Sequence, residues 1–382
     1  MPARASRSPA TPSAPRTRRP LRLALVGFGH VGRRIAELLL GPYGRILRRA
    51  GVEARVTAIA TGRHGLAVNP RGLPLRRALT LVREGRPLRP LHRGRPVAST
   101  RALVETAPYD VLIELSPLEP LTGEPAIAHV AAALRRGRHA VTANKGPVAH
   151  AAGRLSALAR RHGVRFLHEG AVMDGFPVFN LVERCLRGAK VLGFRGVLNA
   201  TTTRILSRME VGVPFDVALA EAQAAGVAEA DPAFDLDGWD AAVKACALAN
   251  ALMGASIRPA DVERVGIRGL TVEAVAKAVL EGKRWRLVVR AGRDGRHVRA
   301  RVAPEELPLG DLLVSDGTDG VLVLDTDLMG EIGLAEGSGG VDQTAYAVLS
   351  DLLEIAGCGG AEPGPGPGRR RSTVLERGGA GG

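Results

Sequence analysis

The sequence predicts an α/β protein with an amino-terminal, doubly wound parallel sheet and a second α+β domain with a mixed sheet. Three observations predict this class. Apolar strands alternate with helical segments over residues 21–167, a glycine-rich turn joins the first strand to the first helix, and alternating strand patterns dominate after residue 260. Strands that alternate with helices indicate a parallel sheet covered on both faces.

Composition narrows the functional classes. The 382 residues suggest two domains with ample core. The formal charge of +15 comes without interleaved aromatic and basic residues, so we expect no specific nucleic-acid partner. No apolar run reaches the ~18 residues that span a bilayer, so we expect no membrane partner. Sparse cysteines without metal or redox spacing (Cys185, Cys246 and Cys358) favour a reducing, cytoplasmic location.

Hydrophobic periodicity places the elements of the first domain. We expect strands at 21–26, 53–60, 110–115, 139–142 and 164–167, and helices at 31–40, 124–136 and 146–162. Residues 62–97 form an excursion rich in glycine, proline and arginine, with room for one short helix.

The pattern changes after Glu169. We expect helices at 177–186, 201–209, 215–225 and 239–253, and strands at 190–198, 262–270, 285–292, 297–304 and 320–325. An apolar helix at 341–356 is expected to return to the first domain. The predicted domains are therefore 21–170, completed by 341–357, and 171–340, between disordered tails at 1–20, which is basic, and 358–382.

The glycine-rich turn predicts a dinucleotide site of the Rossmann type. Residues Gly27, Phe28, Gly29, His30, Val31 and Gly32 form G-x-G-x-x-G between an apolar strand and a helix. Gly27 allows the tight turn, Gly29 lets the backbone approach a pyrophosphate, and Gly32 lets helix and strand pack closely. The alternative is a glycine-rich turn that binds no ligand.

The end of the second strand favours NADP over NAD. An acidic residue there would bind the ribose 2′-hydroxyl of NAD, but residues 60–64 contain none. Arg63, helped by His64 or Arg71, is suited to a 2′-phosphate. Alternatively, Arg63 is one of many loop arginines, and NAD remains an option.

Lysine is scarce in this chain, and two lysines lie in motif-like surroundings. Of 53 basic residues, five are lysine: Lys145, Lys190, Lys244, Lys277 and Lys283. Lysine can release a proton near neutral pH when it is desolvated, whereas arginine cannot. Lys145 follows a strand in Thr-Ala-Asn-Lys, and Lys244 ends an acidic stretch, residues 226–244, one helical turn after Asp240. For the acidic residues, the alternative is that they only cap the helix and interact with its dipole. For Lys145, the alternative is a solvent-exposed position next to Asn144, which would cap the helix.

Two further segments are candidate binding loops. Residues 169–177 combine an acidic residue, Glu169, with exposed carbonyls that suit a hard cation, or they form a hinge. Residues 337–340 precede the last helix, and its free N–H groups can contact the cofactor or substrate; a simple flexible turn is the alternative.

Taken together, these motifs resemble the homoserine dehydrogenase family, in its short, monofunctional form. The matching stretches are V-G-F-G-H-V-G, T-G-E-P-A, V-T-A-N-K-G-P, E-G-A-V-M-D-G-F-P, G-V-L-N-A-T-T, A-E-A-D-P with D-G-W-D-A-A-V-K, and T-D-L-M-G with Q-T-A-Y-A-V-L-S-D-L. The resemblance implies reversible, NAD(P)-dependent reduction of L-aspartate 4-semialdehyde to L-homoserine, by a homodimer assembled through the second domain.

The resemblance also implies residue roles. Lys145 and Lys244 take the catalytic positions, and Glu229 and Asp240 the substrate-binding ones. The cofactor contacts include Ser116, Lys145 and Gly337 besides the residues of the glycine-rich turn. A monovalent cation such as Na⁺ falls on Glu169, Val172, Asp174 and Phe176, mostly through backbone oxygens.

Some residues depart from the family pattern near the substrate positions, at Met173–Pro177, Ala200, Thr203 and Ala335–Glu336. Two other functions therefore remain open. One is a related NADP-dependent dehydrogenase that acts on another amino-acid-derived alcohol or carbonyl. The other is a non-catalytic dinucleotide-binding protein.

Overall fold

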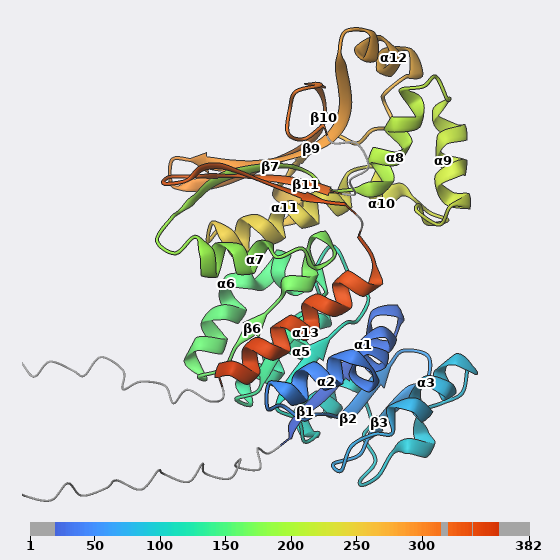
Figure 1. The fold of residues 1–382 in the computed structure, drawn as a ribbon, viewed down its shortest axis with the longest axis vertical. Helices are drawn as coiled ribbons and strands as arrows, with labels where there is room; N and C mark the ends of the chain where they lie inside the picture. The colour runs from blue at the N-terminus through green and yellow to red at the C-terminus, as the bar shows by residue number, and fades with distance from the viewer. Residues whose placement is uncertain (1–19, 315–319, 338, 359–382) are drawn as a thin grey trace, which may run out of the picture.

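The computed structural model describes residues 20–314, 320–337 and 339–358. Two six-stranded sheets organise this part of the chain, one in each half of the molecule (Figure 1). The predicted tails lie outside the described residues apart from Pro20 and Cys358. No helix of the described part has the length and apolar character needed to cross a bilayer.

The first sheet has the strand order β3-β2-β1-β4-β5-β6. Its strands are β1 (Leu21–Val26), β2 (Ala54–Thr61), β3 (Gly65–Val68), β4 (Val111–Glu114), β5 (His139–Thr142) and β6 (Phe166–Leu167). All neighbours are parallel except β2 and β3, which form an antiparallel pair at the edge. The predicted doubly wound sheet is confirmed, and the antiparallel edge strand is an addition to it.

Helices cover both faces of the first sheet because its strands are apolar on both sides. One face packs against α1 (His30–Leu40), α3 (Leu75–Arg83) and the returning α13 (Val341–Cys358). The other face packs against α4 (Thr100–Thr106) and α5 (Ala126–Arg135). Helix α2 (Pro42–Arg49) packs on α1, and a single 3-10 turn spans Arg89–Leu91.

The second sheet has the order β12-β11-β7-β9-β10-β8. Its strands are β7 (Val191–Val197), β8 (Glu263–Arg264), β9 (Lys283–Asp294), β10 (His297–Pro308), β11 (Gly320–Thr326) and β12 (Gly330–Glu336). Only β8 and β10 pair in parallel, so the sheet is mixed, as predicted. Leu322 and Leu324 point into the large core, whereas Val321 and Val323 form a small cluster on the opposite face.

Two helices join the halves of the molecule. Helix α6 (Lys145–Arg161) follows β5 of the first sheet and packs along α11 (Trp239–Leu252), which covers the second sheet (Figure 1). The Asn250 side chain of α11 donates a hydrogen bond of 2.7 Å to the Ala149 carbonyl of α6. This bond holds the last turn of α11 against the start of α6.

The other helices described in the second half are α7 (Val178–Asn180), α8 (Ala200–Met209), α9 (Phe215–Ala224), α10 (Ala233–Leu236) and α12 (Val272–Leu280). A π-helical turn, Leu181–Cys185, continues α7. Short 3-10 turns occupy Glu169–Ala171, Met173–Gly175 and Pro259–Asp261.

Several expectations for local structure were wrong. The expected strand at 262–270 shrinks to the two residues of β8, because Gly266 and Gly269 interrupt it. Helices α2, α4 and α12, and strands β3 and β12, were not predicted. These elements are short, and tertiary contacts stabilise such elements more than their own periodicity does. The helix expected at 177–186 is α7 and the π-helical turn.

Candidate active site

Lys145 and Lys244 meet on one buried carboxylate. Lys145 Nζ lies 3.3 Å from Asp240 Oδ1, and Lys244 Nζ lies 2.8 Å from Asp240 Oδ2. Asp240 is 7% exposed. Lys244 and Asp240 lie one turn apart on α11, as their spacing predicted, whereas Lys145 comes from α6. The scarce lysines of the two halves therefore face a common site.

The electrostatics of this triad keep Asp240 and Lys244 charged. Burial alone would raise the pKa of Asp240, but Lys244 and Lys145 outweigh burial and lower that pKa well below its usual value. Burial would likewise lower the pKa of Lys244, but the Asp240 carboxylate reverses the effect and raises it. Lys244 is therefore a protonated ammonium at neutral pH, which suits a proton donor.

The ammonium of Lys244 has one N–H group to spare. Besides Asp240, it donates to the Leu198 carbonyl at the end of β7. A lysine ammonium carries three donors, so the third is left for a substrate atom. The side chain of Lys244 is 15% exposed and that of Lys145 is 28% exposed, so a ligand can reach both.

The start of α6 positions Lys145. Asn144 caps this helix: its Oδ1 accepts the Gly146 N–H at 2.8 Å. The same side chain donates to the Ser116 carbonyl at 2.9 Å, just beyond β4. Lys145 and Ser116 therefore lie at the carboxyl ends of neighbouring parallel strands, where ligands bind in such sheets. The alternative of a merely solvent-exposed Lys145 is not what the structure shows.

Two carboxylates of the acidic stretch have different positions. Asp235 is half-buried and accepts a 2.8 Å hydrogen bond from Asn199, which also bonds Asp240. The charge of Asp235 contributes to the raised pKa of Lys244. Glu229 is exposed in the connection between α9 and α10, where its backbone carbonyl bonds Gln223. The sequence analysis assigned Glu229 to the pocket and gave no role to Asp235 or Asn199, although Asp235 lies within the acidic stretch 226–244.

The glycine-rich turn has the geometry that a dinucleotide needs. Gly27 has φ +96°, and a β-carbon on it would lie 2.3 Å from the Leu115 carbonyl oxygen. A β-carbon on Gly32 would lie 2.6 Å from the Gly27 carbonyl oxygen. Gly29, in contrast, has open space within 4 Å of its β-carbon position. It precedes His30 and Val31 at the start of α1, whose first turn has no acidic residue and no side-chain cap. The helix therefore presents free N–H groups to an anion.

The other predicted cofactor contacts lie in separate segments. Ser116 donates its hydroxyl to Glu114, which is fully buried at the end of β4. Arg63 is exposed in the turn between β2 and β3 and has no side-chain partner among the described residues. Gly337 follows β12 near the start of α13, beside Phe176 in a shared cavity.

The predicted cation loop is organised around the Glu169 side chain. Its carboxylate accepts the backbone N–H groups of Phe179, at 3.0 Å, and Asn180, at 2.8 Å, so it holds the start of α7. The Val172 carbonyl accepts the Gly175 N–H and the Phe176 carbonyl accepts the Val178 N–H of α7, while the exposed Asp174 has φ +43°. In the described residues, no cluster of three His, Cys, Asp or Glu could hold a metal.

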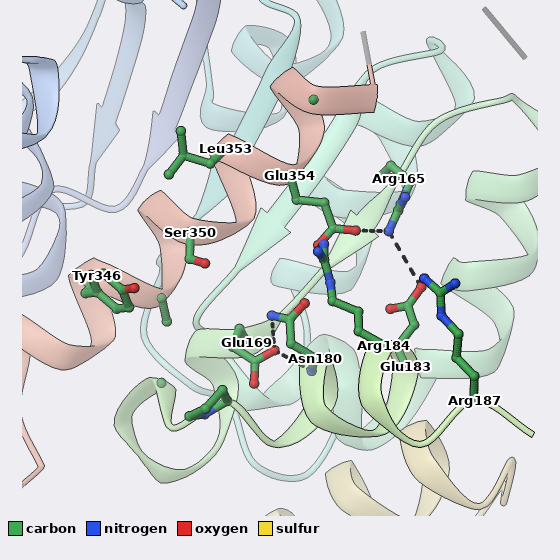
Figure 2. A pocket seen from close by; sticks show the side chains of 14 residues that line it. Arg165, Glu169, Asn180, Glu183, Arg184, Arg187, Tyr346, Ser350, Leu353 and Glu354 are labelled. Atoms are coloured by element: carbon green, nitrogen blue, oxygen red, sulfur yellow. Dashed lines mark hydrogen bonds and ion pairs between the residues drawn. The ribbon is translucent and has the colours of Figure 1, made fainter. Parts of the chain in front are cut away.

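A cavity of about 1070 Å³ lies away from the lysines, between α13 and the segment that runs from β6 to the π-helical turn (Figure 2). Glu354 of α13 lies there between Arg165 and Arg184, and its carboxylate pairs with both. Its lining contains neither Lys145 nor Lys244. The cavity is therefore separate from the site around Asp240.

Comparisons with known proteins assign the chain. The family model "Homoserine dehydrogenase, NAD binding domain" matches residues 27–169, and "Homoserine dehydrogenase" matches residues 177–353. The chain belongs to the homoserine dehydrogenase family. The predicted resemblance is thus confirmed.

Individual homoserine dehydrogenases are similar over most of the chain. The NAD(+)-dependent enzyme of Pseudomonas canavaninivorans is 35% identical, over 87% of this chain and 96% of the relative. The homoserine dehydrogenase of Methanocaldococcus jannaschii is 36% identical, over 87% of this chain and 98% of the relative. A hyperthermophilic archaeal homoserine dehydrogenase solved with NADPH superposes with a TM-score of 0.73 at 29% identity, covering 88% of this chain and 98% of that one.

Proposed function

We propose that this homoserine dehydrogenase family member interconverts L-homoserine and L-aspartate 4-semialdehyde with a nicotinamide cofactor. The convergence of Lys145 and Lys244 on Asp240 carries the proposal. Two ammonium groups, held by one buried carboxylate at the junction of a dinucleotide-binding half and a second half, suit a carbonyl oxygen that gains negative charge.

The chemistry follows from the charges of the triad. The nicotinamide cofactor, when bound, supplies or accepts the hydride. The third N–H of Lys244 stabilises the charge that develops on the carbonyl oxygen and then delivers a proton to it. Lys145 adds positive charge from α6, and Asp240 orients both ammonium groups. In homoserine oxidation, Lys244 in its neutral form would accept the proton of the substrate hydroxyl, and the cofactor would accept the hydride.

Carboxylates of the acidic stretch bind the α-ammonium group of the substrate. Asp235 supports this role because it is half-buried beside the triad. Glu229 retains the substrate role that the family resemblance implies, and its exposed loop would have to bring it toward the triad. Substitution of each carboxylate separates the two assignments.

For the cofactor, we propose a preference for NADP, with NAD as a second choice. Arg63 supports the preference because, in the part of the chain that the structure describes, its guanidinium has no side-chain partner, and it lies just beyond β2, where a 2′-phosphate is recognised in this kind of sheet. The pyrophosphate would lie at the N-terminus of α1, on the side where Gly29 leaves open space. Ser116, Lys145 and Gly337 complete the proposed set of cofactor contacts.

The proposed assembly is a cytoplasmic homodimer formed through the second domain. Its support is the segment after β10, where Leu309 and Leu312 are 53% and 55% exposed and lie in sequence between two members of the small valine cluster, Leu307 and Leu313. Exposed apolar groups of this kind mark association surfaces. Light scattering on the purified chain tests the dimer, and a monomeric mass at micromolar concentration would contradict it.

A monovalent cation in the 169–176 loop remains a prediction. It would coordinate the second lone pairs of backbone carbonyls, because both oxygens of Glu169 already accept N–H groups. We route no chemical step through it. Turnover in sodium, potassium and tetramethylammonium chloride at equal ionic strength tests it, and equal rates in all three would remove the cation from the proposal.

The decisive experiment is oxidation of L-homoserine by the purified protein, followed by absorbance of the reduced cofactor at 340 nm with NADP and with NAD. A panel of L-serine, L-threonine and 4-hydroxybutyrate serves as the control for substrate identity. We expect turnover of L-homoserine with kcat/KM well above that of the panel. Preferred turnover of another alcohol, or cofactor binding without turnover, would overturn the proposal.

A further inference from the structure

The end of strand β7 connects three charged groups of the site. The Leu198 carbonyl accepts from Lys244. The next residue, Asn199, is 4% exposed, and its Nδ2 donates to Asp235 Oδ1 at 2.8 Å and to Asp240 Oδ2 at 3.0 Å. One amide group thus bridges both carboxylates of the site, and none of the motif reasoning gave Asn199 a function.

The bonding pattern requires an amide side chain. Asn199 Nδ2 supplies two N–H donors, one for each carboxylate, while Oδ1 accepts the Thr202 N–H at 2.9 Å and caps α8. Aspartate could still cap the helix, but it would place a third carboxylate against Asp235 and Asp240. Serine could cap as well, yet its single hydroxyl donor cannot bond both acids.

The bridge limits how Asp240 can rotate. Asp240 Oδ2 is shared by Asn199 and Lys244, whereas Oδ1 faces Lys145. Without the amide, the two lysines alone would hold the carboxylate, and Lys244 would follow its movement. We propose that Asn199 is a positioning residue, which holds Asp240 and Asp235 in place and thereby directs the free N–H of Lys244 at the reacting oxygen. This inference rests on the proposed function, and it adds to it a residue that touches neither substrate nor cofactor.

A purely structural role makes a different prediction. If Asn199 served only to cap α8, any good capping residue would restore activity. Asn199→Ser and Asn199→Asp both keep a capping oxygen, so both separate capping from bridging. Thr271→Ala, which removes the exposed cap of α12, controls for the loss of a helix cap elsewhere.

Steady-state kinetics of the whole protein provide the first test. In Asn199→Ser, we expect kcat for L-homoserine to fall about 10- to 100-fold, because small misplacements of catalytic groups cost this much. The Kd for NADPH, from its fluorescence, should stay within about twofold, and Tm should be no lower than that of Thr271→Ala, because serine still caps α8. In Asn199→Asp, the acid limb of the kcat profile should also move to higher pH, because neighbouring carboxylates favour protonation.

The scarcity of lysine allows a second test that needs no turnover. With five lysines in the chain, the Nζ resonance of Lys244 can be followed in lysine-labelled protein. We expect its protons to exchange faster with water in Asn199→Ser than in the parent. If the parent protein fails to oxidise homoserine, the proposed function is wrong. The exchange rate of the Lys244 protons still tests whether Asn199 positions Asp240 and Lys244, because this measurement needs no turnover.

Three results would overturn the inference. One is a kcat within twofold of the parent in both Asn199 variants. Another is a loss of kcat matched by weaker NADPH binding and a lower Tm, since that would report general loosening. The third is an unchanged Lys244 resonance in Asn199→Ser.

Discussion

At the scale of single residues, the few lysines of this chain fall into two groups, those at the surface and those at the candidate active site. Lys190, Lys277 and Lys283 lie on the surface, where they pair with nearby acids or bond them through the backbone. Lys145 and Lys244 alone approach the buried Asp240. Arginine would supply the same charge in that position, but a guanidinium is a much weaker acid than an ammonium and is therefore the poorer proton donor to a reacting oxygen.

We therefore expect Lys244→Arg to reduce kcat by about 100- to 10,000-fold, the range that general acid catalysis contributes. The Kd for NADPH should stay close to that of the parent, because Lys244 lies on α11 rather than in the nucleotide turn. Stopped-flow turnover and fluorescence titration measure the two quantities. Lys277→Arg, at a side chain 77% exposed, is the matched control. Equal kcat for Lys244→Arg and the parent would disprove the proton role.

Substitution of the carboxylates distinguishes Asp235 from Glu229. Asp235→Asn should raise the KM for L-homoserine by roughly 10-fold or more, because a hydrogen bond to a charged group contributes about 1.5–3 kcal/mol. Glu229→Ala tests the role implied by the family resemblance. An increase in KM would mean that its loop closes over the substrate, whereas an unchanged KM would remove Glu229 from the pocket.

At the scale of elements, the β1–α1 turn shows how one motif combines packing and binding. Gly27 and Gly32 are required by close backbone contacts, with β-carbon positions 2.3 Å and 2.6 Å from carbonyl oxygens. Gly29 is free of such contacts. The need for glycine at position 29 must then come from a ligand that approaches the backbone, as the G-x-G-x-x-G motif predicted.

Gly27→Ala and Gly29→Ala should therefore fail in different ways. Gly27→Ala should lower Tm strongly, because the added methyl group meets the Leu115 carbonyl and φ is +96°. Gly29→Ala should leave Tm nearly unchanged but raise the Kd for NADPH. Calorimetry and fluorescence titration measure these effects. A stable Gly29→Ala protein that binds NADPH as the parent does would place the pyrophosphate elsewhere.

The β2–β3 turn sets the cofactor preference in our proposal. Arg63→Ser should raise the KM for NADP by about 10-fold and leave that for NAD within about twofold, since a charge-assisted pair with phosphate is lost. Arg86→Ser, at a surface arginine paired with Glu84, is the control. If Arg63→Ser changes both KM values equally, the preference does not depend on the 2′-phosphate.

At the scale of the whole molecule, α13 ties its two halves together through buried acids. Asp351 of α13 is 1% exposed, and its Oδ2 accepts the backbone N–H of Glu169 at 3.2 Å. Burial raises the pKa of Asp351 well above its usual value, and burial raises the pKa of Glu169 to about 7. Both groups are therefore more protonated in the folded chain than in the unfolded chain around pH 5–6.

The sign of the pH dependence follows from this difference. Groups with a raised folded-state pKa stabilise the fold fully below their unfolded pKa, and that stability is lost as the pH rises through the folded pKa. We expect Tm to fall between pH 5 and pH 8. The side chain in Asp351→Asn has no proton to lose over this pH range. The fall in Tm from pH 5 to pH 8 should therefore be smaller in this variant than in the parent, by roughly a few degrees.

Differential scanning calorimetry across this pH range measures the effect. Asp342→Asn is the matched control, because Arg34 lowers the pKa of Asp342, so this group titrates below the range. The slope of the control should equal that of the parent. An Asp351→Asn slope as steep as that of the parent would show that Asp351 is charged in the folded protein.

Sequence alone determined much of this protein. The apolar strands β1, β2, β4 and β5, the turn at Gly27–Gly32, and the Asp240–Lys244 pair were all predictable, because each depends on residues close together in the chain. The family could be recognised for the same reason, since its motifs are short and local.

Tertiary structure decided what depends on distant segments. Residue spacing could not show that Lys145 and Lys244 share Asp240, that Asn199 bridges Asp235 and Asp240, or that Glu229 lies exposed. It also could not show that Glu169 caps α7. Short elements such as α12 and β12 were missed because packing, rather than local periodicity, stabilises them. Local pattern specifies which groups are available, and long-range packing decides which of them meet, because contacts between distant residues leave no periodic trace in the chain.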